Sequence, residues 1–235
     1  MCGRYTLTVT LRVIQEMFDL ANDDIKEIIE NYRPNYNVAP THKMPVVYQE
    51  EGKNRLKLMQ WGLLPSWSKT DQLKFSTINA KGEELPQKPT YRNCLKNRRC
   101  LVVADGFYEF EKHGQDKWAV RFIMKDKKPF TFAGLYDTWN GTTTKGEKKT
   151  ITSYTIITTS PNKIVEPVHS RMPVILTKDG ANEWVDPKYQ KYEELSHLLK
   201  PYEGNDLVRY YANPGVNKAG NNSIELLNEF DRNQT

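Results

Sequence analysis

The chain has 235 residues, of which 38% are hydrophobic, enough for a buried core in one domain. Its net charge of +5 mildly favours an anionic partner. The longest apolar runs fall far short of the roughly 20 residues of a membrane span, and no signal peptide opens the sequence. These features exclude an integral membrane protein, and we expect a cytoplasmic protein with no membrane partner.

The three cysteines, Cys2, Cys94 and Cys100, cannot all pair with one another. The sequence contains neither a CxxC motif nor a cluster of histidines and cysteines. We therefore expect no disulfide bonds, no metal site and no cofactor.

The first residues lead into the strand-like alternation of residues 5–9. Because the Cys2 side chain is small, we expect an aminopeptidase to remove Met1 and leave Cys2 at the mature terminus. Its α-amine would then titrate near ~7.7–8.0 and its thiol near ~8.5. The amine can form a Schiff base with an aldehyde, and the thiol can close on the imine carbon to give a five-membered thiazolidine ring. The alternative is that Cys2 simply packs within a buried first strand.

The apolar spacing of residues 11–30 predicts one or two amphipathic helices, broken near residues 22–24, where an aspartate can cap a new helix. A polar loop with two prolines, residues 33–41, follows. The rigid ring of Pro40 could wedge between stacked bases if this loop faced a nucleic acid. The alternative is a stiff connector before the next strand.

Residues 45–48 and 56–61 predict a β-hairpin, which runs into an aromatic loop. We expect Trp61 to lie in the core and Trp67, within a polar run, to lie on the surface, where a base can stack on it.

Residues 77–83 then predict the end of a strand. There the Asn79 amide is free to orient a substrate and Lys81 can meet a phosphate. Ordinary turn chemistry is the alternative.

Residues 91–100 contain four cations, Arg92 among them, in a composition suited to phosphates or to a solvated helix surface. The strand at residues 101–104 then leads to Glu109, which lies among aromatic residues. Desolvation there would raise the carboxyl pKa and allow acid or base catalysis near neutral pH. Alternation along the strand cannot decide whether Glu109 points inward or outward, because both neighbours are aromatic.

Strands are expected at residues 118–124, 130–136 and 153–159, with a mobile polar connection at 140–150. His169 follows them in a loop bracketed by prolines, two residues before Arg171. A lone histidine is usually structural, but this one could transfer protons while Arg171 holds a phosphate with two hydrogen bonds.

The C-terminal part predicts helices at residues 179–184 and 192–199 and an edge strand at 207–211. A loop rich in Gly and Asn at 213–222 would let main chain approach a ligand. We expect a frayed tail at residues 229–235. With no internal repeat and no linker, residues 1–235 are predicted to form a single domain.

Seven short motifs, in this order, carry a resemblance to one known family. They are Met1-Cys2-Gly3-Arg4, Tyr36-Asn37-Val38-Ala39-Pro40, Trp61-Gly62-Leu63-Leu64-Pro65-Ser66-Trp67, Asn79-Ala80, Arg98-Arg99-Cys100, Ala104-Asp105-Gly106-Phe107-Tyr108-Glu109 and His169-Ser170-Arg171-Met172-Pro173. The sequence resembles the SRAP family, the SOS-response-associated peptidases that are also described as abasic-site processing proteins. The ordered match runs from Cys2 to about Asn222.

This resemblance implies an α+β fold, a single compact domain with a twisted β-barrel-like core of mostly antiparallel strands flanked by helices. It also implies a positively charged channel for single-stranded DNA. In that channel the N-terminal Cys would form a covalent crosslink with an abasic site and protect the site during the response to DNA damage, a lyase-type activity. We expect a monomer that associates with the nucleoid when it is bound to damaged DNA.

By motif position, the resemblance also assigns roles to individual residues. The reacting groups would be Cys2 as nucleophile, Asn79 holding the amine and sugar, Glu109 moving protons, and His169 assisting Schiff-base chemistry and crosslink reversal. The DNA-binding residues would be Arg4, Asn37, Pro40, Trp67, Lys81, Arg92 and Arg171. The sequence departs from the family pattern at Lys81, where Arg is common, and at Phe110, where Trp is common.

Two other functions fit the same residues. In a peptidase, Cys2 would attack an amide after removing its own leader, although only Met1 precedes it in this sequence. A noncovalent nucleic-acid binding module would not need Cys2 at all, and its binding would be equal for abasic and intact strands and strongly salt-dependent.

Overall fold

The structure is a computed structural model that describes residues 2–73, 76–114 and 116–231. Its strands are β1 (Arg4–Leu7), β2 (Asn35–Val38), β3 (Lys43–Glu50), β4 (Lys53–Trp61), β5 (Asn79–Lys81), β6 (Arg99–Ala104), β7 (Gly106–His113), β8 (Asp116–Met124), β9 (Phe130–Thr142), β10 (Lys148–Thr159), β11 (Met172–Pro173), β12 (Ile175–Leu176) and β13 (Leu207–Tyr211). The α-helices are α1 (Leu11–Phe18), α2 (Asn22–Ile28), α3 (Arg92–Asn97), α4 (Lys178–Val185) and α5 (Tyr192–Leu195). Short 3-10 helices cover Gly82–Glu84, Ser196–Leu198, Pro214–Asn217 and Ile224–Leu227.

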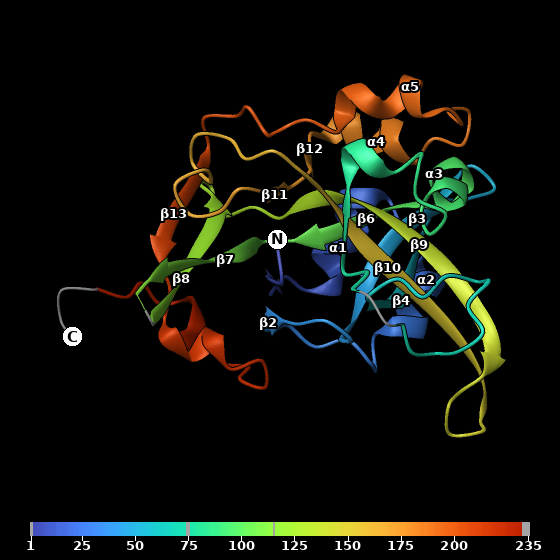
Figure 1. Cartoon of the computed structure of the whole chain (residues 1–235), viewed down its shortest axis with the longest axis horizontal. Coiled ribbons are helices and arrows are strands. Elements are labelled where there is room, and N and C mark those ends of the chain that lie inside the picture. The colour runs from blue at the N-terminus through green and yellow to red at the C-terminus, as the bar shows by residue number, and fades with distance from the viewer. Residues whose placement is uncertain (1, 74–75, 115, 232–235) are drawn as a thin grey trace.

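Five strands form a closed ring at the centre of the molecule. Neighbouring strands pair in the order β10, β4, β3, β6 and β9, and β9 also pairs with β10, so that the path returns to its start. Every pairing in the ring is antiparallel except that of β10 with β4. Helices lie around these strands (Figure 1). The predicted α+β fold with a β-barrel-like core is therefore confirmed.

A second, antiparallel sheet has the order β13, β8, β7, β1 and β2. It packs on the barrel through Tyr5 of β1, whose ring meets Trp61 edge-on with centroids 5.2 Å apart. The buried hydroxyl groups of Tyr5 and Tyr154 also share a hydrogen bond of 2.6 Å. Because β1 contacts the barrel in this way, the residues at its start lie between the two sheets.

A buried ionic cluster fixes β1 in the second sheet. Asp105 accepts hydrogen bonds from the Thr6 hydroxyl at 2.5 Å and from the Thr8 amide at 2.5 Å. The Arg121 guanidinium of β8 lies 3.6 Å from the same carboxylate, and these two side chains are only 8% and 6% exposed. Asp105 therefore ties the first strand to the loop between β6 and β7 and to β8.

Most predicted elements are present close to their expected positions. The helical region of residues 11–30 divides into α1 and α2, and residues 45–61 form the β3–β4 hairpin. The cap of α2 differs, because Ala21 occupies the capping position and no side chain caps the helix. No helix among the described residues is long and apolar enough to cross a membrane.

Three segments differ from the sequence prediction because of pairing that is distant in sequence. Within the expected loop at 33–41, residues of β2 pair with β1. Asn79 begins β5 instead of ending a strand, because it pairs with Ile156 of β10. Most of the expected mobile connection at 140–150 belongs to β9 and β10, which pair as far as Thr142 and Lys148.

The end of the chain is also more ordered than expected. Glu229 forms a β-bridge with Ala212, and the Phe230 amide donates to the Tyr211 carbonyl at 2.7 Å. Residues 229–231 are therefore held by the fold, and residues 232–235 of the predicted frayed tail lie outside the described residues.

Asp105→Asn should lower the free energy of unfolding by about 3–5 kcal/mol, because Arg121 would keep a buried charge without its ionic partner. Urea unfolding monitored by circular dichroism measures the loss. Asp23→Asn is the matched control: Asp23 pairs with Lys26 on the surface, where its side chain is 90% exposed, and we expect a loss below about 1 kcal/mol. Equal losses in the two variants would contradict the anchoring role of Asp105.

Candidate active site

Cys2 lies at the start of the strand that connects the two sheets. Its side chain is fully buried, with 0% exposed, and its carbonyl oxygen accepts a hydrogen bond of 2.7 Å from the Asn79 amide. Burial, and then the negative charge of Glu109, raise the pKa of the Cys2 thiol well above its ordinary value. The expected thiol pKa near ~8.5 is therefore wrong for the folded chain, because desolvation disfavours the thiolate.

Glu109 points inward from β7, and its side chain is 2% exposed. Arg4 pairs with Tyr108 in an antiparallel register, so Glu109 lies beside the residues that precede Arg4. Burial raises the pKa of Glu109 to about 8. The inward orientation that the sequence left open is thus settled, and at neutral pH most of this carboxyl group is protonated and can donate a proton.

Asn79 joins Cys2 to the barrel. Its Nδ2 atom donates to the Cys2 carbonyl, whereas its buried Oδ1 atom has no hydrogen-bond partner among the described residues. The Trp61 indole donates to the carbonyl of Ile78 at 2.8 Å, and the Tyr91 hydroxyl donates to the carbonyl of Asn79 at 3.3 Å. These two contacts hold the backbone at Asn79, and the buried Oδ1 atom can accept a further hydrogen bond.

His169 lies in the loop between β10 and β11, where it is half-buried. Its Nδ1 atom accepts a hydrogen bond of 3.0 Å from the Arg171 amide, which places the proton of the neutral ring on Nε2. Burial lowers its pKa, so the ring is neutral at neutral pH. Arg171 in turn donates to the Thr158 carbonyl at 2.7 Å, and Thr158 pairs with Lys81. The His169 loop therefore contacts the end of the β5–β10 ladder that begins at Asn79.

Arg4 and Asn37 hold the C-terminal loop against the second sheet. Arg4 donates to the Asn37 side-chain oxygen at 3.0 Å and to the Val216 carbonyl at 2.8 Å. Asn37 is 0% exposed, and its Nδ2 atom donates to the carbonyls of Val216, Lys218 and Asn221. In this structure both side chains thus bind the protein's own backbone.

Two predicted phosphate-binding cations are paired with carboxylates. Arg171 donates to both carboxylate oxygens of Glu83, at 2.6 and 2.9 Å, and the pair lowers the Glu83 pKa. Lys81 lies 2.7 Å from Glu84. The sequence analysis did not identify Glu83, although two consecutive acids so close after a predicted cation are a signal of such pairing.

The other predicted DNA-binding side chains reach the surface. Arg92 is exposed, Pro40 is partly exposed and Trp67 is 57% exposed. Trp61 is 0% exposed, as expected for a core residue. The sequence offered no reason to assign a role to His42, whose Nδ1 accepts from the Ala39 amide at 3.3 Å, next to Pro40. Burial and then the nearby charge of Arg4 lower the pKa of His42.

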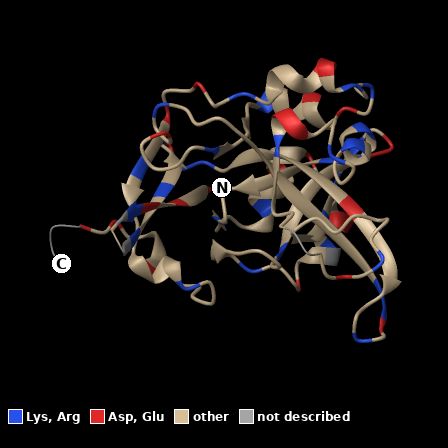
Figure 2. Ribbon diagram, viewed as in Figure 1, with Lys and Arg blue, Asp and Glu red and all other residues tan. Residues whose placement is uncertain are grey.

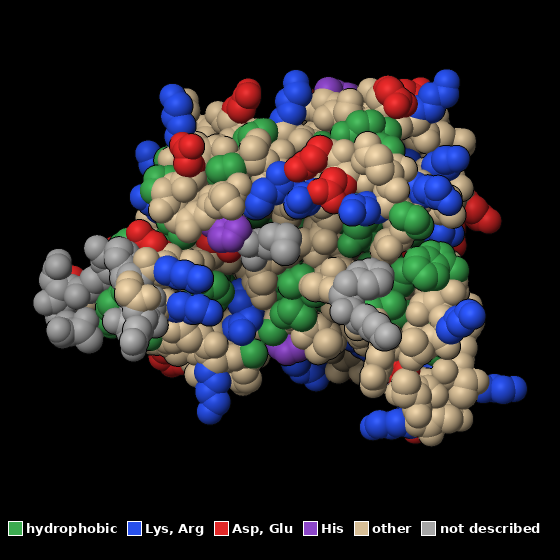
Figure 3. All heavy atoms as spheres, viewed as in Figure 1, with side chains coloured by type: hydrophobic (Ala, Val, Ile, Leu, Met, Phe, Trp, Pro, Cys, Tyr) green, Lys and Arg blue, Asp and Glu red, His purple; other side chains and the backbone are tan. Residues whose placement is uncertain are grey.

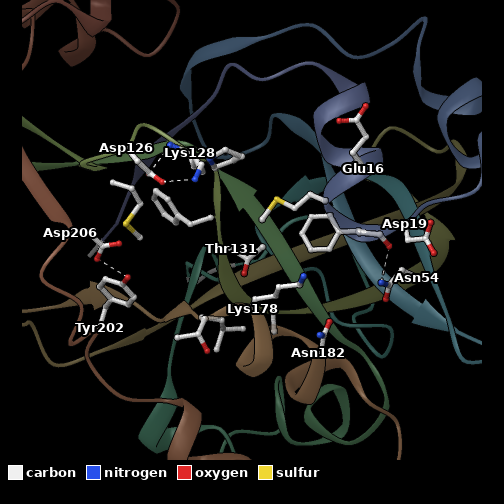
Figure 4. A pocket seen from close by; sticks show the side chains of 18 residues that line it. Glu16, Asp19, Asn54, Asp126, Lys128, Thr131, Lys178, Asn182, Tyr202 and Asp206 are labelled. Carbon is white, nitrogen blue, oxygen red and sulfur yellow. Dashed lines mark hydrogen bonds and ion pairs between the residues drawn. The ribbon is translucent and has the colours of Figure 1, made fainter.

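A pocket of about 810 Å³ lies elsewhere, between α1, α4 and the turn that joins β8 to β9. Figure 4 shows its rim, where Asp126 pairs with Lys128 and the Tyr202 hydroxyl donates to Asp206. No predicted site residue lines this pocket, so it is separate from the site around Cys2. Within the described part of the chain, no three His, Cys, Asp or Glu residues are grouped closely enough to hold a metal ion.

Comparisons with known proteins agree with this arrangement. Residues 1–219 match the family described as SOS response associated peptidase (SRAP). The chain is 39% identical over 228 residues to the abasic site processing protein YoqW of Bacillus subtilis (strain 168), covering 97% of this chain and 99% of that protein. It is 32% identical over 227 residues to the abasic site processing protein HMCES of Gallus gallus, covering 83% and 66% of the two chains.

The fold is also similar to solved structures. A crystal structure of a protein from Bacteroides thetaiotaomicron superposes with a TM-score of 0.86 and 23% identity, covering 97% of this chain and 100% of that chain. Another, from Bordetella bronchiseptica, gives a TM-score of 0.73 and 22% identity, covering 90% and 100%. These likenesses show the fold, and the sequence match over residues 1–219 shows the family. The chain belongs to the SRAP family.

Proposed function

We propose that this protein processes abasic sites in single-stranded DNA by forming a thiazolidine crosslink through Cys2, which shields the damaged strand from cleavage. The observation that carries this proposal is the juxtaposition of three groups: Cys2, the Asn79 amide bound to its carbonyl, and the buried Glu109 carboxyl beside them. The relatives named abasic site processing proteins support it. One copy of the chain carries all these groups, so we propose a monomer that acts in the cytoplasm on nucleoid DNA.

The proposed reaction begins with removal of Met1, which frees the α-amine of Cys2. The amine adds to the aldehyde carbon of the ring-opened deoxyribose, and the carbinolamine loses one water to give an imine. The Cys2 sulfur then adds to the imine carbon while the thiol proton goes to the nitrogen. The ring so formed contains the former aldehyde carbon, the nitrogen, Cα, Cβ and sulfur.

Each neighbouring group has a role in these proton transfers. Glu109, mostly protonated at neutral pH, donates a proton to the sugar ring oxygen during opening and to the hydroxyl that leaves as water. The Oδ1 atom of Asn79 accepts a hydrogen bond from the amine or a sugar hydroxyl. Neutral His169 transfers protons during Schiff-base formation and crosslink reversal.

We propose that the strand on either side of the lesion contacts the remaining predicted residues. Arg4, Lys81, Arg92 and Arg171 would meet phosphates. Pro40 and Trp67 would direct the bases, and Asn37 would support Arg4 from within the fold.

A peptidase activity, which the family description records, is the alternative use of Cys2. A cysteine hydrolase attacks with its thiolate and therefore needs a thiol with a depressed pKa. Here burial and Glu109 raise the pKa of the Cys2 thiol. This setting favours a reaction in which the amine attacks first and the protonated thiol follows.

Cys2→Ala should abolish the denaturation-resistant species that forms on incubation with an abasic single-stranded oligonucleotide, because the variant lacks the sulfur that closes the ring. Denaturing gel electrophoresis measures the crosslinked fraction, and intact mass establishes that Met1 is removed. Cys94→Ala, which alters another buried thiol, is the matched control and should crosslink like the parent. Cys2→Ser should trap the aldehyde only through its amine, as a species that acid or nucleophiles reverse.

A stable adduct with Cys2→Ala would refute the proposed function. Peptide turnover by the parent in the absence of DNA, lost in the same variant, would favour the peptidase. Equal binding of Cys2→Ala and the parent to abasic and intact strands, with no crosslink from either, would favour the noncovalent module.

Glu109→Gln should remove a pH dependence of stability. In the parent, the unfolded chain loses the Glu109 proton near the ordinary pKa of 4.5, whereas the folded chain keeps it until about pH 8. Parent stability should therefore fall as pH rises through this window, by up to about 5 kcal/mol, and the neutral amide escapes the fall. Urea unfolding at several pH values between the two pKa values measures the difference.

The same variant should crosslink about 10²-fold more slowly or worse, because an amide cannot donate the proton. The exposed Glu30 provides the control Glu30→Gln, whose stability should follow that of the parent at every pH. If the stabilities of Glu109→Gln and the parent changed in parallel across the window, the buried acid would not titrate as proposed.

Glu83→Gln should tighten noncovalent binding to single-stranded DNA about fivefold, roughly 1 kcal/mol, because a phosphate would no longer compete with a carboxylate for Arg171. Fluorescence anisotropy with an intact oligonucleotide at fixed salt measures the affinity. Glu193→Gln removes the same charge from an exposed residue without an ion pair in the described part of the chain. Binding by Glu83→Gln no tighter than by this control would exclude Arg171 as a phosphate contact.

A further inference from the structure

The β9–β10 hairpin forms a long arm that projects from the barrel (Figure 1). Its strands pair from Gly134 and Ile156 near the barrel to Thr142 and Lys148 at the tip. Ile156 also pairs with Asn79, so the arm starts beside the proposed reaction site. At about 3.3 Å per residue, β10 spans about 23 Å from Ile156 to Lys149. The tip of the arm therefore lies several nucleotides away from the site along a DNA strand.

The tip carries a net positive charge, because its three lysines outnumber the single acid Glu147. Lys145, Lys148 and Lys149 are exposed. Lys69 is also exposed, in the adjoining loop, which follows β4 and includes residues 66–71. None of these four lysines forms a side-chain hydrogen bond or ion pair with another described residue, in contrast to Lys81 and its partner. Figure 2 colours the Lys and Arg positions at this end of the hairpin blue, with an acidic position in red beside them, and Figure 3 shows basic side chains that project from the surface at lower right.

The adjoining loop braces the arm. The Trp139 indole donates to the Ser68 carbonyl at 2.8 Å, and the Ser66 amide donates to Asp137 at 2.8 Å. Nearer the tip, the Thr144 amide donates to Asp71 at 2.8 Å. This same loop presents the exposed Trp67 indole, a predicted stacking residue. The lysines of the tip and the proposed base platform thus belong to one connected unit.

We propose that this arm, with Lys145, Lys148 and Lys149 at its tip, binds the phosphate backbone of the DNA that flanks the abasic site. The proposal rests on the proposed function, since it takes DNA as the substrate. Lysine provides a mobile point charge suited to phosphate. Apart from lysine, residues 142–150 are Thr, Gly and Glu. Because this segment has no aromatic ring on which a base could stack, the contact is with the phosphate backbone and not with bases.

The test uses Lys145→Gln/Lys148→Gln/Lys149→Gln and a matched triple variant, Lys125→Gln/Lys127→Gln/Lys178→Gln. The control lysines are also exposed and lie beside the opposite end of β9 or on α4. The probe is single-stranded DNA with a tetrahydrofuran analogue of the abasic site, which has no aldehyde and cannot crosslink. A short version of the probe extends about 2 nucleotides on either side of the analogue, and a long version extends about 12. At about 3.4 Å per phosphate, the spacing in duplex DNA, only the long version reaches the tip of the arm.

For the long probe, we expect the arm variant to reduce the slope of log affinity against log salt by about 2–3 relative to the parent, since each lost phosphate contact removes about 0.7–0.9. The short probe should bind all three proteins equally. A long probe with duplex flanks shows which form of DNA the arm contacts, and a reduced slope with either form supports the proposal. An unchanged slope for both forms, or an equal reduction in the control variant, would overturn it and assign the lysines to protection of the hairpin edges from aggregation.

Crosslinking separates this proposal from the function on which it rests. At saturating concentration of a short aldehyde-bearing strand, the arm variant should give the same yield as the parent. If the parent itself gave no crosslink, the proposed function would fail, while the salt slopes measured with the analogue would still decide whether the arm binds DNA.

Discussion

The structure depends on the burial of Cys2 at the very start of the described chain. Terminal residues usually fray, because few contacts hold them. Here the carbonyl of Cys2 is bound to Asn79, and β1 is fixed by Asp105, which holds Thr6 and Thr8. The proposed nucleophile is thus placed by two independent anchors, one on the barrel and one on the second sheet. A site built on a chain terminus requires both, because either anchor alone would leave the terminus free to rotate.

The same burial determines the chemistry. Desolvation raises the pKa of the Cys2 thiol and of the Glu109 carboxyl together, so both groups are mainly neutral at neutral pH. A neutral thiol is a poor first nucleophile, whereas a neutral carboxylic acid is a good proton donor. The site is therefore suited to adding an amine to a carbonyl carbon with acid assistance and poorly suited to thiolate attack on an amide. This is the physical difference between the proposed function and the peptidase alternative.

Local periodicity and composition predicted the helices α1 and α2 and the exposure of Trp67. The barrel-like fold was expected only from the resemblance to the SRAP family. The sequence could not decide the orientation of Glu109, which depends on how β7 packs against the residues before Arg4. Nor could it show that Asn37 is fully buried, since that follows from three carbonyls of a loop about 180 residues later in the chain. Register and long-range pairing, absent from any local pattern, account for these differences.

The cations that we propose to contact DNA differ in their present partners, and this difference would change how they act on DNA. Arg4 and Arg171 near the site already bind protein oxygens, so a phosphate that approaches them must exchange with an existing partner. Such an exchange releases few counterions and gains little free energy, but it fixes the strand in one position. The lysines of the arm are solvated, so neutralising phosphates there releases counterions and gives salt-dependent affinity. On the proposed function, affinity and positioning would therefore belong to different parts of the fold: the arm would retain the strand, and the paired arginines would align the lesion with Cys2.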